Sequence, residues 1–178
     1  MSTRSGKSES VALEEDGFRR VGWIALGTPS TFSVNFDFDA ARSWRNAIYA
    51  FRIGGAVVRI GVAAILIQKM VQLEKDLSRA LAGEFRTGGP NPWETYEWRR
   101  RLARHRVGEF WAQPGPANRA LAARQERKLI LKYDPCLSND GPTGRKRPAD
   151  QRMVRNIATA KATWNELNSD ALPSPKRR

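Results

Sequence analysis

The sequence holds one histidine, His105, and one cysteine, Cys136, which are the two side chains best suited to nucleophilic or acid–base catalysis. Such catalysis needs a nucleophile, a base beside it and a third group that orients the base. His105 lies in the run Arg-Arg-Arg-Leu-Ala-Arg-His-Arg, and Cys136 follows Pro135 with no histidine near it in the sequence. We interpret both as non-catalytic, and the sequence predicts that the chain is not an enzyme.

Motifs for metals and cofactors are missing from the sequence as well. A zinc site is built from several Cys or His ligands, and one residue of each type is too few. The stretch Gly141-Pro-Thr-Gly144-Arg-Lys contains glycines and basic residues but lacks the spacing of a phosphate-binding loop. The carboxylate pair Glu94 and Glu97 is interpreted as charge on a helix surface. We expect no catalytic residue, no cofactor, no metal and no small-molecule substrate.

The charge of the chain indicates an anionic partner. The formal net charge is +13, and residues 99–132 alone carry ten basic and two acidic side chains. Nucleic acid, anionic lipid and acidic protein surfaces all attract such a charge. Arginine outnumbers lysine, and the planar guanidinium group suits fixed, bidentate contacts in an interface.

Basic and aromatic side chains are interleaved after residue 91, which predicts a contact surface for partner proteins or lipid. The residues assigned to this surface are Arg52, Arg59, Trp93, Trp98, Arg99, Arg100, Arg101, Arg104, Arg106 and Trp111. Aromatic side chains next to arginines suit lipid headgroups, and they also suit stacked bases and phosphates. For a nucleic-acid partner, the alternative contacts are Arg145, Lys146, Arg147, Lys176, Arg177 and Arg178.

The elements that would position these residues are dominated by one long helix. Asp39 is a good N-cap, no proline follows until after Ala82, and Gly83 is a natural stop. Apolar residues alternate at spacings of four and three from Ile53 to Val71, which is typical of a helix-packing seam. The sequence therefore predicts an apolar helix over 39–83, continuous from about 40 to 82, with a candidate membrane span at 49–71.

Arg59 lies near the middle of that candidate span. A lone arginine at mid-bilayer costs at least about 2.5–3.5 kcal/mol unless a carboxylate or carbonyl receives it. No acidic residue lies within one turn of Arg59 on the expected helix. We expect its partner to come from another subunit. The alternative is a helix in the core of a water-soluble assembly.

The remaining segments complete a mainly α fold, with three shorter helices, a short N-terminal β-hairpin and extended basic tails. Residues 1–16 are a polar arm, and 17–38 form the hairpin or an extended arm, with Phe32, Val34 and Phe36 alternating with polar residues. Residues 91–133 are a basic helical pair, 134–147 a linker, 148–168 an amphipathic helix and 169–178 a basic tail. Asn91 with Pro92 and Glu94 is a clear helix start.

These features together favour a non-catalytic accessory or structural subunit of a large membrane protein complex. The expected setting is an energy-converting complex of the mitochondrial inner membrane, where the chain contacts other subunits and anionic lipid. The alternative is a basic structural protein of a ribonucleoprotein, of the ribosomal or nucleocapsid type, or a nuclear protein. In the ribonucleoprotein the basic runs bind nucleic-acid phosphates, and in the nuclear protein the same runs are localisation signals.

Overall fold

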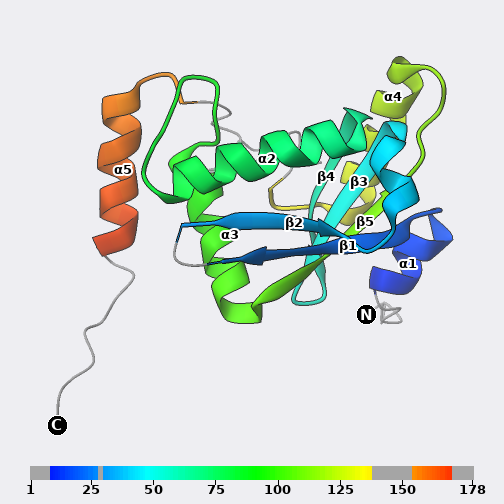
Figure 1. Cartoon of the computed structure of the whole chain (residues 1–178), viewed down its shortest axis with the longest axis horizontal. Coiled ribbons are helices and arrows are strands. Elements are labelled where there is room, and N and C mark those ends of the chain that lie inside the picture. Colours follow the sequence, from blue (N-terminus) through cyan, green and yellow to red (C-terminus); the bar gives the residue numbers. More distant parts are fainter. Residues whose placement is uncertain (1–8, 28–29, 138–153, 170–178) are drawn as a thin grey trace, which may run out of the picture.

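The computed structural model describes residues 9–27, 30–137 and 154–169 (Figure 1). The elements, in chain order, are α1 (Glu9–Glu15), β1 (Arg19–Leu26), β2 (Phe32–Phe36), the 3-10 turn η1 (Asp39–Ser43), β3 (Arg45–Ile53), β4 (Ala56–Ile65), α2 (Leu66–Leu81), α3 (Pro92–His105), β5 (Val107–Gln113), α4 (Arg119–Tyr133) and α5 (Ile157–Ser169).

The strands form one five-stranded sheet in the order β2-β1-β5-β3-β4, and every neighbouring pair is antiparallel. The expected N-terminal hairpin is present as β1 and β2, but it is the outer part of this sheet and not an isolated ribbon. The fold is α/β, so the prediction of a mainly α fold is wrong.

The predicted long helix over 39–83 is also wrong. This segment contains η1, the β3–β4 hairpin and only then a helix, α2. Gly54 and Gly55 form the hairpin turn with φ angles of +60° and +90°, which only glycine adopts at low cost. β3 pairs with a strand on each side and is buried almost throughout, so it presents a near-continuous apolar run. In the sequence, such a run cannot be distinguished from a buried helix by its periodicity.

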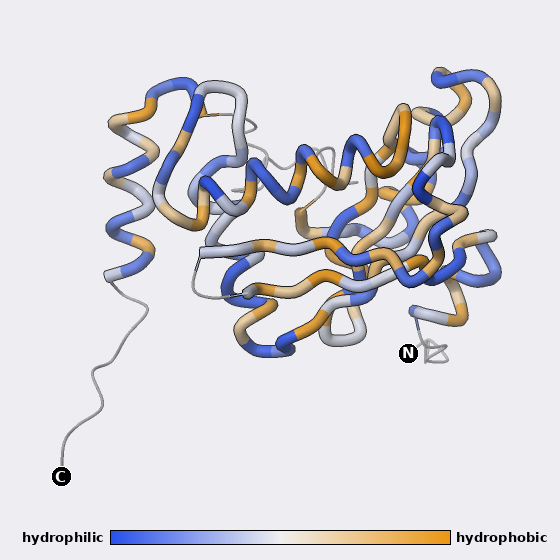
Figure 2. The backbone as a smooth tube through the Cα atoms, in the orientation of Figure 1, coloured by the Kyte–Doolittle hydropathy of each residue, from blue (hydrophilic) through white to orange (hydrophobic). Residues whose placement is uncertain are grey.

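No helix in the described parts of the chain is long and apolar enough to cross a membrane. α2 is the longest of the described helices. It begins inside the predicted span (49–71) and is amphipathic. Leu66, Met70, Leu73 and Leu77 face the protein interior, while Val71 and Gln72 face outward. Figure 2 shows this alternation as hydrophobic and hydrophilic segments along the helix.

Helices cover both faces of the sheet. On one face, α2 and α3 pack against a core that includes Tyr49, Phe51 and Trp98. On the other face, α1 and α4 cover a second core that includes Ile48 and Trp111. β3, β4 and β5 therefore send side chains into both cores, and residues two apart on a regular stretch of β3 or β4 share a face.

The helix start at Asn91 is confirmed, because the Asn91 side chain accepts a hydrogen bond of 2.8 Å from the backbone N–H of Glu94. The helix ends at His105, however, and residues 107–113 form the strand β5, which lies inside the stretch 91–133 expected as a helical pair. α5 packs beside α3, and Trp164 makes an edge-to-face contact with Phe85 at 5.8 Å between ring centres.

Candidate active site

Three polar side chains from distant parts of the chain meet on the face of the sheet that α3 covers. Tyr49 lies on β3 and Arg59 on β4, and both point to this face because Tyr49 pairs with Gly61 and Phe51 pairs with Arg59. Glu94 lies in the first turn of α3 and forms an ion pair with the Arg59 guanidinium. The same guanidinium donates a hydrogen bond to the Tyr49 hydroxyl. We call Tyr49, Arg59 and Glu94 the polar cluster.

Gly61 makes room for the tyrosine. It lies directly opposite Tyr49 in the β3–β4 register, and a Cβ atom at position 61 would overlap the Tyr49 hydroxyl and ring edge. The Tyr49 ring is only 2% exposed and cannot swing into solvent to avoid such an overlap. The glycine thus lets the phenol ring cross β4 and reach Arg59.

The polar cluster lies at the border between core and solvent. The side chains of Arg59 and Glu94 are 17% and 14% exposed, whereas Tyr49 is almost fully enclosed. Desolvation works to lower the pKa of Arg59, but the charge of Glu94 and the hydrogen bonds with Tyr49 and Glu94 outweigh it, so the pKa is raised above its ordinary value. Arg59 is therefore a permanent positive charge in a partly dry site.

The start of α3 fixes the position of Glu94. Asn91 is the N-cap, and its backbone carbonyl also accepts hydrogen bonds from the backbone N–H and the side-chain hydroxyl of Thr95, at 3.0 and 2.9 Å. Glu94 is the third helical residue, where the positive end of the helix dipole favours a carboxylate. Pro92 at the first helical position has a backbone angle that is already helical.

Lys69 is a second basic side chain near this face, besides Arg59. α2 packs against β2 and also against β4 and α3. At 100° per residue, Lys69 lies on the flank of α2 opposite Ile67 and Val71, which line a groove beside β2. It is half-buried, and no carboxylate of the described residues forms an ion pair with it. Lys69 thus faces the side where β4 and α3 lie.

The residues predicted as partner or lipid contacts are scattered over the fold. Arg52 pairs with Glu109 at 2.9 Å and Arg99 bonds to Asn168, while Arg100 and Arg101 both pair with Glu97. Trp98 is fully buried and Trp111 is 5% exposed, whereas Trp93 is 40% exposed. Arg104 and Arg106 are exposed at the end of α3. Of all these, only Arg59 belongs to the polar cluster. Arg145, Lys146, Arg147, Lys176, Arg177 and Arg178 lie outside the described residues.

Arg59 has the carboxylate partner that the sequence argument required, but the expected source was wrong. The partner is Glu94 of the same chain, 35 residues further on, and not a residue of another subunit. Glu94 itself had been interpreted as a surface charge. His105, in contrast, rests against Gly54 at the tip of the β3–β4 hairpin, and Cys136 lies beside the backbone carbonyl of Val58.

No group of three or more His, Cys, Asp or Glu side chains gathers into a metal-binding cluster among the residues that the structure describes. One or two carboxylates are nevertheless enough to bind Mg²⁺ when a substrate phosphate is present. Mg²⁺ usually keeps several water ligands and binds through one or two carboxylates together with substrate phosphates. Glu94, partly exposed and the one carboxylate of the polar cluster, fits that donor set.

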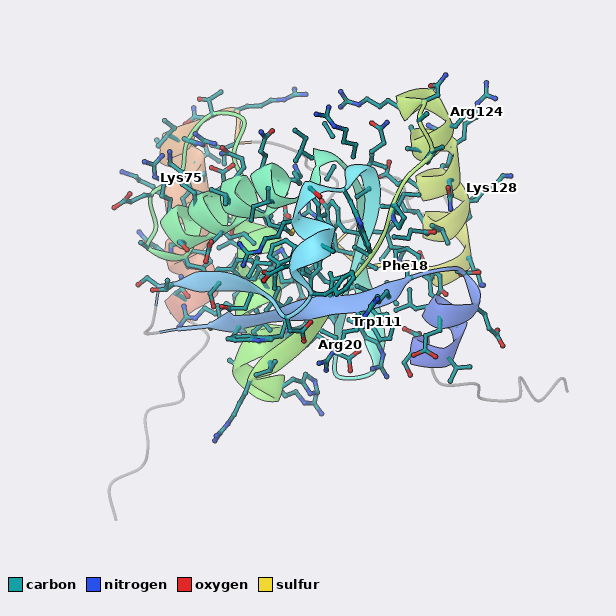
Figure 3. The ribbon with its side chains drawn as sticks, turned by 45° about the vertical axis from the view of Figure 1, so that its right-hand side comes forward. Phe18, Arg20, Lys75, Trp111, Arg124 and Lys128 are labelled. Carbon is teal, nitrogen blue, oxygen red and sulfur yellow. The ribbon has the colours of Figure 1, made fainter. Side chains whose placement is uncertain are left out.

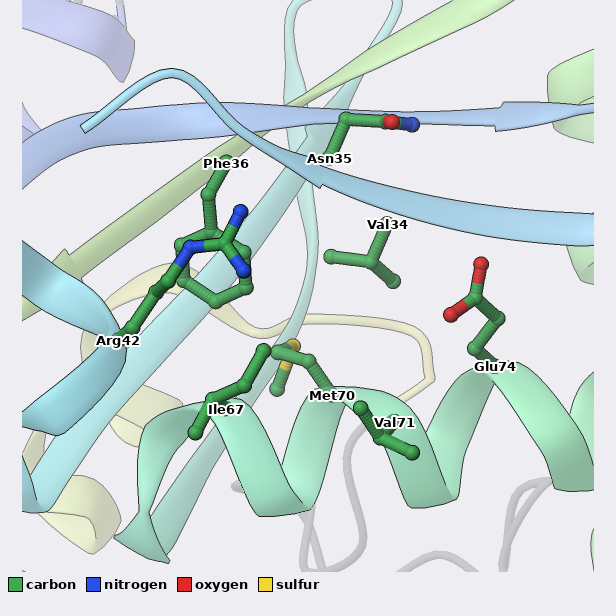
Figure 4. Close-up of a pocket in the computed structure, with 8 residues that line it drawn as sticks. All are labelled: Val34, Asn35, Phe36, Arg42, Ile67, Met70, Val71 and Glu74. Carbon is green, nitrogen blue, oxygen red and sulfur yellow. The ribbon is translucent and has the colours of Figure 1, made fainter. Parts of the chain in front are cut away.

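A separate groove of about 250 Å³ lies between β2 and α2 (Figure 4). Its walls are Val34, Asn35, Phe36, Arg42, Ile67, Met70, Val71 and Glu74. Arg42 lies over the Phe36 ring at 5.0 Å from its centre and is paired with Asp39 at 2.9 Å. The lining includes Arg42 and Glu74 but no tyrosine, histidine or cysteine, so it lacks the combination of hydroxyl, arginine and carboxylate that the polar cluster has.

Comparison with known proteins gives a fold but no family. The sequence matches no family model, and no curated protein sequence is detectably similar to it. Restriction endonuclease HPY188I in complex with product DNA is 14% identical, with a TM-score of 0.46 over 81% of this chain and 88% of that chain. A mutant of bacteriophage T4 EndoII is 16% identical, with a TM-score of 0.50 over 72% of this chain and 97% of that chain. The likeness to EndoII shows a shared fold.

These findings overturn the predicted function. A non-catalytic subunit of a membrane complex was expected from a long apolar helix, and that segment is a β-hairpin followed by an amphipathic helix. The chain shares its fold with bacteriophage T4 EndoII, which contradicts the predictions of a structural subunit and of a chain that is not an enzyme. The same findings count against a structural protein of a ribonucleoprotein. The mitochondrial location and the subunit and lipid partners stay predictions.

Proposed function

We propose that this chain is a nuclease that hydrolyses phosphodiester bonds of nucleic acid at the Tyr49–Arg59–Glu94 cluster. The single observation that carries the proposal is the cluster itself, which joins a hydroxyl, a permanent positive charge and a carboxylate from three elements at the border of the core. The fold shared with EndoII supports the proposal, as does the net charge of +13.

Each residue of the cluster matches one requirement of phosphodiester hydrolysis. Negative charge grows on the phosphoryl oxygens in the transition state, and Arg59, held in a partly dry site, stabilises it. The Tyr49 hydroxyl orients the attacking water. The oxygen of this water bonds to phosphorus while the bond to one sugar oxygen breaks; one water proton ends on that sugar oxygen and the other leaves the new phosphate monoester.

Glu94 is the residue that would hold a divalent cation. Such a cation, when bound, neutralises charge on the phosphate and lowers the pKa of a bound water. The Arg59–Glu94 ion pair closes the site in the absence of substrate, and a phosphate competes with Glu94 for Arg59. Substrate binding thus frees the carboxylate at the moment when it is needed. Lys69, from α2, supplies a further positive charge on the same side.

The first experiment is a nuclease assay on the purified full-length chain. Supercoiled plasmid, linear DNA duplex, single-stranded DNA and RNA are incubated with Mg²⁺ or Mn²⁺, and with a chelator in parallel. We expect nicking or cutting of at least one of these substrates, with loss of activity in Tyr49→Phe, Arg59→Gln and Glu94→Gln. General acid–base and electrostatic contributions of this kind are typically about 10²–10⁴-fold in rate.

The chain offers a matched control for these variants. Arg52 and Glu109 form a second arginine–glutamate ion pair on the same sheet, with an Arg52 side chain 16% exposed, close to the 17% of Arg59. Glu109 also accepts a hydrogen bond of 2.8 Å from the Trp111 indole. Glu109→Gln should keep full activity. Equal loss in Glu94→Gln and Glu109→Gln, or no cleavage of any substrate by the unaltered chain, contradicts the proposal.

A further inference from the structure

α4 presents a row of cations that form no ion pair with a carboxylate of the described residues. Arg124, Arg127 and Lys128 are exposed on the outer side of this helix. None of them forms an ion pair with a described residue, in contrast to Lys132 of the same helix, which is paired with Asp16 at 2.7 Å. Figure 3 shows Arg124 and Lys128 projecting away from the body of the molecule. We call Arg124, Arg127 and Lys128 the α4 cation row.

The geometry of α4 makes the row a rigid surface. The opposite side of the helix is anchored by Ala122, Leu129 and Ile130, which are buried against the sheet. Arg124 and Lys128 are four residues apart and therefore share one face, about 6 Å apart along the axis. Phosphates of one B-DNA strand advance by about 3.4 Å of axis each, so the two side chains span neighbouring phosphates.

The row lies beside the strand that carries Arg59 of the polar cluster. α4 packs over β4, and β4 is an edge strand of the sheet. Arg59 points from β4 to one face of the sheet, while α4 covers the other face. The β4 edge is covered at Val58, where the backbone N–H of Leu137 donates a hydrogen bond of 2.7 Å to the Val58 carbonyl. A polymer that passes over this covered edge can touch both the cluster and α4, whereas a small substrate cannot.

We infer that the α4 cation row binds the phosphate backbone of the nucleic-acid substrate and holds the polymer over the covered β4 edge; the inference rests on the proposed nuclease function. The row supplies sequence-independent affinity, and the cluster supplies the chemistry. Phosphate contacts of this kind fix the position of a polymer without reading its bases.

An anionic membrane surface is the other partner that cations on a helix attract. A helix that lies on a membrane buries a continuous apolar face among the lipids. The apolar face of α4 is already buried in the protein, and only Leu121 and Leu131 are exposed beside the cations, at 49% and 53%. The observations therefore favour a phosphate polymer.

The test measures the salt dependence of binding. A short labelled DNA duplex and a labelled single strand are titrated with the full-length Glu94→Gln protein, which prevents cleavage, over a range of salt concentrations. The same titration is repeated after adding Arg124→Gln, Arg127→Gln and Lys128→Gln together. Because each phosphate contact contributes about 0.9 to the slope of log affinity against log salt, the triple change should flatten the slope by about 2–3 and weaken binding at least about tenfold at low salt.

The control removes three equally exposed and unpaired cations elsewhere, by Lys75→Gln, Arg79→Gln and Lys161→Gln. Lys75 lies at the opposite end of the molecule from Arg124 and Lys128 (Figure 3), and α5, which carries Lys161, is likewise far from α4 (Figure 1). This control should change the slope less than the α4 variant does. Unchanged thermal unfolding of both variants shows that the effect is on binding.

Three results overturn the inference, and they are distinguishable. If the protein binds and the unaltered chain cleaves nucleic acid, but the α4 variant and the control behave alike, the inference alone fails. If the α4 variant loses affinity for vesicles that contain phosphatidylserine and keeps its affinity for both nucleic acids, the row is a lipid surface. If the unaltered chain neither binds nor cleaves nucleic acid, the proposed function fails together with the inference.

Discussion

The ion pair between Arg59 and Glu94 predicts a large, measurable coupling in stability. Removing one member leaves the other charged side chain partly buried without its partner. Breaking a fully buried pair costs about 3–5 kcal/mol. Because these side chains are 17% and 14% exposed, we expect about 2–3 kcal/mol for Arg59→Met, including the lost hydrogen bond to Tyr49.

The assay is urea unfolding followed by tryptophan fluorescence, applied to Arg59→Met, Glu94→Gln and the double variant. With both charges gone, neither is stranded, so the double variant should be more stable than the sum of the two single effects predicts. We expect a coupling free energy of about 1–3 kcal/mol, in the range of residues in direct contact. Arg52→Met with Glu109→Gln provides the same cycle on the control pair.

The refuting result is specific. Additive effects, with a coupling below about 0.5 kcal/mol as found for distant residues, show that Arg59 and Glu94 do not form this pair in solution. The proposed active site at the polar cluster then has no structural basis, because it depends on the contact between Arg59 and Glu94. A large coupling for Arg52 with Glu109 and none for Arg59 with Glu94 contradicts the account in the same way.

Three further predictions follow from single contacts. Gly61→Ala should abolish cleavage and lower the melting temperature, because the new methyl group overlaps Tyr49. Gly88→Ala is the control, since an added Cβ there meets nothing within 4 Å. This variant should keep its activity and lose only the stability that the positive φ of residue 88 costs. Asn91→Ala should cost about 1 kcal/mol of unfolding free energy in a denaturant titration, by loss of the α3 cap. Burial and the hydrogen bond to Asp16 raise the pKa of Tyr133, so the unfolded chain ionises first and stability is lost as the pH rises above about 10. Unfolding in urea near pH 9 and near pH 11 should show this loss, and Tyr133→Phe should reduce it.

Local signals were sufficient for the elements whose ends are marked by short-range chemistry. The Asn91, Pro92 and Glu94 pattern gave the start of α3, since the cap is a contact between residues three apart. The second helix of the basic pair expected over 91–133 corresponds to α4 (Arg119–Tyr133), which ends before Pro135. The alternating Phe32, Val34 and Phe36 marked β2.

The β3–β4 hairpin was missed because two patterns competed. Apolar residues between Ile53 and Val71 fall at helical spacings, yet in the fold they belong to β3, β4 and α2. The glycine pair at 54 and 55, flanked by runs rich in isoleucine and valine, is the hairpin signal that should have taken precedence. Absence of proline indicates little, because a buried strand avoids proline as a helix does.

The polar cluster could not be assembled from local patterns. Arg59 and Glu94 are 35 residues apart, and their contact depends on α3 packing against the sheet. Glu94 was interpreted as a helix-surface charge, which is the common case for a carboxylate in a first turn. Once the hairpin is recognised, the pairing of Tyr49 with Gly61 and the position of Arg59 on the same face follow from the two-residue period of strands.

The central claim, that the polar cluster cleaves phosphodiester bonds, is tested most directly by separating binding from chemistry in one pair of variants. Single-turnover cleavage and equilibrium binding are measured on the same substrate for Glu94→Gln and Glu109→Gln. We predict that Glu94→Gln lowers the cleavage rate at least about a hundredfold while binding stays within about threefold, and that Glu109→Gln changes neither. A Glu94→Gln protein that cleaves as fast as Glu109→Gln contradicts the account.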